Sequence, residues 1–155
     1  MLPARNMAWH FSPSPFCVQK RIAGNALMLN ASLLSIIEEA GVAVLILTEG
    51  LEQDEFLASR LTRAETQRQV KAISECIANL EPHILSSLVE VDWTGWHTVA
   101  RQLGAPDKNA EQDALWFAVR SLVPATLMWL RVYRKEQPDI FECRPSLSDT
   151  IRIKP

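Results

Sequence analysis

The sequence predicts an all-α protein, an up-down bundle of four or five helices joined by short connections. Apolar residues recur at intervals of three and four along most of the chain, which is the period of a helix that buries one face. The alternation and Asn-Gly turns that are typical of strands and hairpins are missing. With 155 residues, of which 48% are hydrophobic and 22% charged, the chain is long enough for one domain with its own core.

We expect three regions along the chain: an N-terminal arm, a helical domain and a C-terminal tail, at residues 1–30, 31–136 and 137–155. The arm contains three prolines among serines and aromatic residues, and proline disfavours helix at itself and at its predecessor. The arm should therefore be partly irregular. In the tail, Pro138 and Pro145 interrupt the chain and the apolar period is lost, so we expect an irregular tail.

The first helix of the domain should begin with Asn30 or Ser32 as its N-cap and end at Gly50. Its apolar face is formed by Leu33, Ile37, Gly41, Val44 and Thr48. A short helical turn is expected over residues 54–60.

The next helix should begin at Thr62, because Thr62 and Glu65 have the T-x-x-E spacing of a capping box. Its apolar positions are Val70, Ile73, Ile77 and Leu80. Pro82 marks its end.

Asp92 is expected to be the N-cap of the following helix, which Gly104 and Pro106 end. Its apolar positions are Trp93, Trp96, Val99 and Leu103. A long helix then runs over residues 110–135, and Pro124 should kink it because proline lacks an amide donor and clashes with the preceding turn.

Charge and cysteine usage limit the classes of function. The formal net charge of −2 gives no general attraction to nucleic acid or anionic membrane. The longest apolar run, residues 41–47, is far shorter than the ~20 residues of a membrane span, so no membrane location is expected. The three cysteines are widely spaced without a C-x-x-C motif. We therefore expect a cytoplasmic protein without disulfides, metal or cofactor.

The order of short motifs resembles the HepT-like family of the HEPN superfamily, over about residues 33–132. The stretches that carry it are ILTEGLEQDEFLASRLTRAETQRQVKAISECIANLEPHI, VDWTGWHTVARQLG and DALWFAVRSLVPATLMWL. The segment Glu55–Arg60 matches the family pattern, except that Ser59 replaces the usual aspartate. Ile73 and Glu75 match two positions of an I-G-E-A-A run. The further matching residues are Trp93, Trp116 and Pro124.

This resemblance implies a helical bundle that forms a homodimer. In the family, two copies of an R-x4–6-H motif meet in the dimer cleft and cleave RNA without a metal. A small nucleotidyltransferase antitoxin is a frequent partner, and it can modify a tyrosine two residues after the histidine.

The motif itself is lost in this chain. Counted from Trp93, the arginine, histidine and tyrosine positions hold Ala100, Ala105 and Asp107. Alanine neither binds phosphate nor transfers a proton, and aspartate offers no hydroxyl for adenylylation. A shift of one residue makes Arg101 the motif arginine, but no histidine follows it.

One alternative arrangement keeps catalysis possible. His97 and Arg101 are one helical turn apart, so both side chains can project from one face, and two copies across a dimer could replace the lost motif. The other interpretation of this pair is a solvated helix surface. Likewise, Trp93, Trp96 and Trp116 are expected to pack in the core or a dimer interface, with base stacking as the alternative.

Three functions therefore compete. The first is a catalytically degenerate HepT-like protein that acts as a binding or regulatory module, with a possible nucleotidyltransferase partner and only weak support for RNA binding. The second is an active metal-independent ribonuclease toxin that uses His97 and Arg101. The third is an assembly protein without any link to a toxin–antitoxin pair.

Overall fold

A computed structural model describes residues 15–142 of the chain, with side chains over 24–142. All regular structure in this part is helical, which confirms the all-α prediction. The elements in chain order are α1 (Pro15–Thr48), α2 (Gln53–Ala58), α3 (Arg60–Asn79), α4 (Pro82–Ser87), α5 (Trp93–Leu103), α6 (Lys108–Phe117), the π-helical η1 (Ala118–Leu122), α7 (Val123–Glu136) and α8 (Pro138–Phe141). The expected arm before residue 15 and the tail after residue 142 lie outside the described residues.

The longest element, α1, begins well before the expected N-cap. The backbone is helical from Pro15 onward, so the prediction of a cap at Asn30 or Ser32 is wrong. Asn30 is instead buried, and its amide group joins two segments: it donates to the Glu81 carboxylate at 3.0 Å and accepts from the Glu81 backbone N–H at 3.3 Å. The predicted end is correct, because Gly50 has a φ of +71°, a conformation that favours glycine.

The start of α3 also differs from the prediction. The helix begins at Arg60 with Ser59 as N-cap, and the Ser59 hydroxyl donates to the Thr62 hydroxyl at 2.8 Å. Thr62 is therefore a residue of the first turn and not a cap. A capping box does occur in this region, but it belongs to α2 and is formed by Glu52 and Glu55.

Pro82 begins a helix that the sequence analysis missed. The helix α3 ends at Asn79, and Pro82 is the first residue of α4, a position where its missing N–H has no intrahelical partner to lose. Ile84 and Leu88 of this segment are buried in the core. Pro82 therefore lies at a helix boundary, as predicted, but it begins α4 and is not the residue that ends α3.

The prediction for α5 is confirmed in detail. The Asp92 carboxylate accepts a hydrogen bond from the Gly95 N–H at 2.8 Å, as an N-cap should. The helix ends at Leu103, with Gly104 as its C-cap. Trp96 and Val99 are buried, as the apolar period requires.

The disturbance expected at Pro124 takes the form of the π-helical segment η1. There the Val123 N–H donates to the carbonyl of Ala118, five residues back, where an α-helix would use the residue four back. A proline cannot donate and its ring needs room beside the preceding turn, so the wider turn accommodates it.

The beginning of the expected tail is ordered. Residues 138–141 form the short helix α8, and Phe141 is 7% exposed. The Arg134 guanidinium lies 4.8 Å from the centre of the Phe141 ring, which holds α8 on α7. A buried aromatic residue therefore extends the packed region past the predicted boundary at residue 136.

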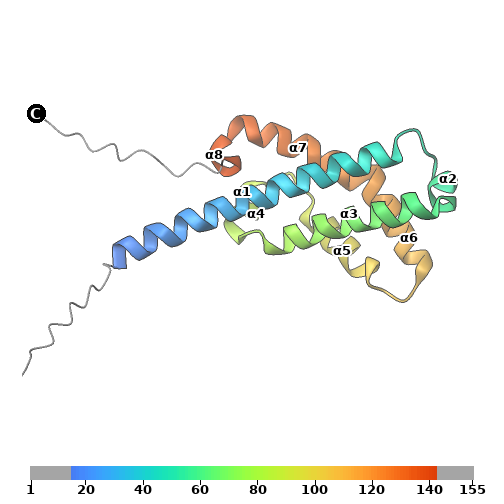
Figure 1. Cartoon of the computed structure of the whole chain (residues 1–155), viewed down its shortest axis with the longest axis horizontal. Helices are drawn as coiled ribbons and strands as arrows, with labels where there is room; N and C mark the ends of the chain where they lie inside the picture. Colours follow the sequence, from blue (N-terminus) through green and yellow to red (C-terminus); the bar gives the residue numbers. More distant parts are fainter. Residues whose placement is uncertain (1–14, 143–155) are drawn as a thin grey trace, which may run out of the picture.

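The core lies between α1 and the other helices. Figure 1 shows α1 and α3 side by side and antiparallel, with α7 and α8 also along α1, while the N-terminal part of α1 extends beyond the rest of the body. The largest fully buried side chains come from most elements: Leu34, Ile37, Phe56, Ile73, Ile77, Ile84, Leu88, Trp96, Leu115 and Leu130.

Two helical stretches are long and apolar enough to cross a membrane by length and composition, Gly24–Thr48 and Lys108–Glu136. Core helices of soluble proteins satisfy the same criteria, and 39% of each window is buried here. The two stretches are therefore weak evidence for a membrane location.

Candidate functional site

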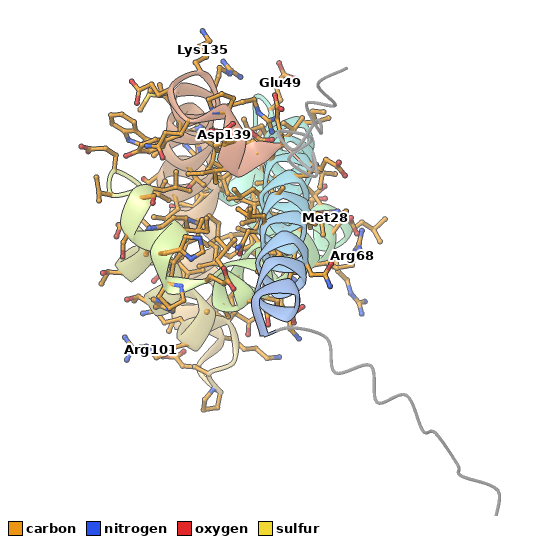
Figure 2. The ribbon with its side chains drawn as sticks, turned by 90° about the vertical axis from the view of Figure 1, so that its left-hand side faces the viewer. Met28, Glu49, Arg68, Arg101, Lys135 and Asp139 are labelled. Atoms are coloured by element: carbon orange, nitrogen blue, oxygen red, sulfur yellow. The ribbon has the colours of Figure 1, made fainter. Side chains whose placement is uncertain are left out.

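The two side chains of the alternative catalytic pair lie on the surface of α5. His97 and Arg101 are both exposed, and Arg101 points away from the body (Figure 2). Within the described part of the chain, neither side chain has a hydrogen bond or ion pair to a carboxylate that would orient it. The structure thus places both groups on one accessible turn of helix without building a cavity around them.

Ala100, at the arginine position of the family motif, lies at a hollow between α3 and α5. We call it the α3–α5 hollow; it has a volume of about 330 Å³ and is lined by Gln67, Lys71, Ser74, Glu75, Ala78, Ala100, Leu103 and Gly104. Its lining contains a cation, Lys71, and a carboxylate, Glu75, one turn apart on α3. No histidine lines this hollow.

The other two motif positions serve the turn between α5 and α6. The Ala105 backbone N–H donates to the Gln102 carbonyl at 3.1 Å, which closes the turn after α5. The Asp107 carboxylate accepts from the Asn109 N–H at 2.9 Å and caps α6. Both positions now have a local structural role.

The three tryptophans of the resemblance are packed against the body. The Trp96 indole is 1% exposed and donates to the Thr126 hydroxyl at 2.9 Å, so no base can stack on it. Trp93 is half-buried, and its indole donates to the Leu85 carbonyl at 3.0 Å.

Trp116 is half-buried between two other side chains. Its ring lies 5.4 Å from the Phe56 ring, and the Arg120 guanidinium lies 5.5 Å from its centre. The first contact joins α6 to α2, the second joins α6 to η1, and both use the Trp116 ring for packing.

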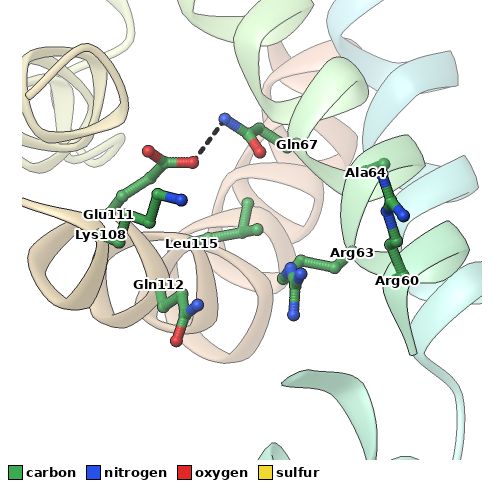
Figure 3. Close-up of a pocket in the computed structure, with 8 residues that line it drawn as sticks. All are labelled: Arg60, Arg63, Ala64, Gln67, Lys108, Glu111, Gln112 and Leu115. Carbon is green, nitrogen blue, oxygen red and sulfur yellow. Dashed lines mark hydrogen bonds between the residues drawn. The ribbon is translucent and has the colours of Figure 1, made fainter. Parts of the chain in front are cut away.

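A second hollow, between the first turns of α3 and α6, has three cationic side chains in its lining. We call it the basic hollow; it has a volume of about 250 Å³ and is lined by Arg60, Arg63, Ala64, Gln67, Lys108, Glu111, Gln112 and Leu115. Figure 3 shows Arg63 and Lys108 on opposite sides of this hollow, with Leu115 between them.

Hydrogen bonds hold two sides of the basic hollow in place. The Gln67 amide of α3 donates to the Glu111 carboxylate of α6 at 2.8 Å, which ties the two helices together. The Arg63 guanidinium donates to the Leu57 carbonyl, at the end of α2. The Gln67–Glu111 bond joins residues 44 positions apart in sequence, so the hollow depends on how α3 and α6 pack.

The basic hollow is not predicted by the sequence pattern, although part of its signal is visible there. Arg60, Arg63 and Gln67 are spaced three and four residues apart, which places them on one face of α3. Lys108 and Glu111 share one face of α6 in the same way. Nothing in the sequence shows that these two faces meet, because that contact is made between elements.

The chain matches no protein-family model, and no solved structure matches it. The fold established for residues 15–142 is an all-helical one, with two hollows along α3 and the motif positions on α5 and the turn that follows it.

Proposed function

We propose that this chain is a catalytically inactive HepT-like protein, an up-down bundle that forms a homodimer and acts as a binding module. The observation that carries the proposal is the chemistry of the motif positions. Ala100 presents a methyl group to the α3–α5 hollow, and Asp107 is used as a helix cap. Proton transfer to and from a ribose hydroxyl requires an imidazole or an equivalent group, and the described residues place none at these positions.

The outer face of α1 supports a homodimer. Exposed apolar side chains follow one another along this helix: Leu27 47%, Met28 46%, Leu29 55%, Ile36 44%, Val42 48%, Leu45 38% and Ile46 68%. Figure 2 shows Met28 projecting outward from α1. Exposed apolar patches larger than a few hundred Å² mark interaction surfaces.

A second copy of the chain is the occupant that fits this face. The inner face of α1 is buried in the core through Leu34, Ile37 and Val44, so a partner can cover the outer face while the bundle stays intact. Glu39 is a charged residue on this face, and its carboxylate accepts a hydrogen bond from the Ser35 hydroxyl at 3.3 Å. Specific interfaces bury roughly 1,000 Å² or more in total, so two copies must cover an area of about this size along α1.

The dimer is tested by light scattering after gel filtration. Wild type should elute as a dimer, and Ile46→Glu should be a monomer with unchanged helical circular dichroism, because a carboxylate would be buried without a partner. Val89→Glu is the matched control: Val89 is 70% exposed and lies in the segment between α4 and α5, so this variant should remain dimeric. A monomeric wild type contradicts the homodimer. Flotation of the wild type with liposomes, absent in Ile46→Glu, also contradicts it.

Active cleavage of RNA is the second candidate, and the exposure of both His97 and Arg101 on one turn of α5 favours it. The inactive module predicts that purified protein leaves a mixed-sequence RNA intact in the absence of metal. Cleavage that is lost in both His97→Ala and Arg101→Ala, and kept in the neighbouring variant Thr98→Ala, would establish the ribonuclease instead.

A nucleotidyltransferase is the proposed partner of the module. Co-expression with a small nucleotidyltransferase encoded beside this chain should give a complex that co-purifies. Because Asp107 has no hydroxyl, the chain should leave the complex without an added nucleotide in its intact mass. An adenylylated peptide that contains residue 107 would contradict this. Failure of the two proteins to co-purify would favour the third function, an assembly protein without a link to a toxin–antitoxin pair.

A further inference from the structure

We propose that the basic hollow binds a phosphate monoester, the phosphate group of a small sugar phosphate or nucleotide. This proposal rests on the hollow itself and does not depend on the resemblance to the HepT-like family. Its cationic side chains are Arg60, Arg63 and Lys108, with Glu111 as the carboxylate in its lining. An excess of positive charge in one hollow of a chain with a net charge of −2 concentrates anions there.

The geometry of the cations suits a phosphate group. Arg60 and Arg63 come from α3 and Lys108 comes from α6, so an anion between them is approached from two sides. Guanidinium groups bind phosphate oxygens in a bidentate manner, and the ammonium group adds a point charge. The Arg63 guanidinium already donates to the Leu57 carbonyl, which limits its rotamers and lowers the entropy cost of binding.

The helix ends reinforce this charge. The residues that line the hollow lie in the first two turns of α3 and of α6. The backbone N–H groups of first turns have no intrahelical acceptor, and the helix dipole gives both ends a partial positive charge. The N-terminus of α3 therefore acts in the same direction as the three side chains, whereas the Asp107 carboxylate, which caps α6 by accepting from the Asn109 N–H at 2.9 Å, offsets the partial charge of that end.

The remaining lining residues favour a phosphorylated sugar over a polymer. Glu111 and Gln112 offer acceptors for ligand hydroxyls, and Ala64 and Leu115 provide an apolar floor. A volume of about 250 Å³ holds a phosphate with its attached sugar. The three cations line one hollow, which suits the dianion of a monoester, whereas a polymer backbone is followed by a track of cations.

Isothermal titration calorimetry with inorganic phosphate, ribose 5-phosphate and adenosine 5′-monophosphate tests the proposal. Saturable binding to wild type is expected, with a Kd on the order of 1 mM or lower. Lys108→Gln and Arg60→Gln should each weaken binding at least about tenfold, since each removes a charge-assisted hydrogen bond. Lys71→Gln, in the α3–α5 hollow, is the matched control and should bind as wild type does.

Two further measurements test whether charge determines the affinity for phosphate. Glu111→Gln should strengthen the binding of inorganic phosphate, because it removes the carboxylate from the hollow. Binding should also strengthen as the pH rises from 5 to 7, because a monoester becomes a dianion with a pKa of about 6. Tighter binding of the two sugar-containing ligands identifies the sugar phosphate as the source, and equal binding of all three identifies free phosphate.

Several outcomes overturn the proposal. The first is the absence of saturable binding by any of the three probes up to about 10 mM. The second is equal binding by wild type and by Lys108→Gln and Arg60→Gln variants whose circular dichroism shows that they are folded. The third is tighter binding of a single-stranded RNA without terminal phosphate than of the monoesters, with this binding lost in the same variants. That result would show that the hollow binds a phosphodiester.

Discussion

Two buried threonines show how one hydroxyl can have opposite effects on stability. Thr126 is 4% exposed and its hydroxyl accepts from the Trp96 indole at 2.9 Å, so a buried donor on α5 is satisfied by α7. Thr66 is 0% exposed, and among the described residues its hydroxyl has no hydrogen-bond partner. A buried hydroxyl costs free energy unless it is paired, so the two residues should respond differently to valine.

Thr126→Val should lower the free energy of unfolding by about 1–3 kcal/mol, because it leaves the Trp96 donor buried without an acceptor. Urea denaturation followed by circular dichroism measures the change. Thr98→Val is the control: its hydroxyl donates to the Thr94 carbonyl within α5 and is not part of a contact between helices. Equal losses in the two variants would show that the Trp96–Thr126 bond does not hold α5 on α7.

Thr66→Val should raise the free energy of unfolding by about 1 kcal/mol, since valine keeps the shape and removes a hydroxyl without a partner. The same denaturation experiment measures it. A loss of stability would mean that the Thr66 hydroxyl has a partner in solution.

The Glu65 carboxylate is a surface group with a strongly lowered pKa. Arg68 donates to it through Nε at 2.9 Å and Nη2 at 2.6 Å, and Gln69 donates at 2.8 Å. The hydrogen bonds from Arg68, followed by that from Gln69, lower the pKa of Glu65 from 4.5 to about 2. A lowered folded-state pKa stabilises the fold above the unfolded value, and this contribution is lost as the pH falls from about 4.5 to about 2.

Carbon-detected NMR of the Glu65 carboxyl group tests this assignment. Its titration midpoint should lie near 2 in wild type and should rise toward 4.5 in Arg68→Gln. Gln69→Ala should produce a smaller rise, because it removes the weaker of the two causes. A wild-type midpoint near that of an isolated glutamate would contradict the bidentate contact.

Between elements, the packing of α1 on α7 depends on a glycine. A Cβ placed on Gly41 would lie 2.9 Å from Cδ2 and 3.1 Å from Cγ of Leu127, closer than side chains normally approach. The sequence pattern placed Gly41 on the buried face of its helix, and the structure shows why the position holds the smallest residue.

Gly41→Val should therefore cost about 1–3 kcal/mol of stability, because the Leu127 side chain must move and the two helices separate. The thermal midpoint by circular dichroism measures the loss, and Leu127→Ala added to Gly41→Val should recover part of it. Gly24→Val is the control on the same helix, because a Cβ there meets nothing within 4 Å. A Gly41→Val variant as stable as this control would show that α1 and α7 pack less closely.

At the scale of the whole molecule, Cys76 reports on the integrity of the core. The thiol lies on α3 in the main hydrophobic cluster, and burial, with a smaller effect of the Glu75 charge, raises its pKa above the ordinary 9.0. A raised pKa keeps the thiol neutral in the folded state and lowers the fraction of reactive thiolate. By linkage, the neutral thiol stabilises the fold below pH 9 and this contribution is lost at higher pH.

In a variant with Cys17→Ser and Cys143→Ser, Cys76 should react with a disulfide reagent at pH 8 far more slowly than an unstructured peptide thiol. The rate should increase with urea in parallel with global unfolding, because α3 is central to the fold. Fast reaction without urea would show that α3 opens locally.

The helical class and the whole of α5 could be read from the sequence because their signals are local. The Asp92 cap, the period of Trp96 and Val99 and the stop at Gly104 all act within one helix. The same reasoning placed Ile73 and Ile77 on the buried face of their helix, since an apolar period identifies the buried face whatever packs against it.

The start of α1, the role of Thr62 and the basic hollow could not be read in this way. Asn30 has the properties of an N-cap, but its amide is used by Glu81, 51 residues away in sequence. Gln67 and Glu111 meet across a separation of 44 residues, and they bring together the faces of α3 and α6 on which the cations lie. Periodicity and caps describe a residue's own helix, whereas a site between helices depends on which faces the folded core brings into contact.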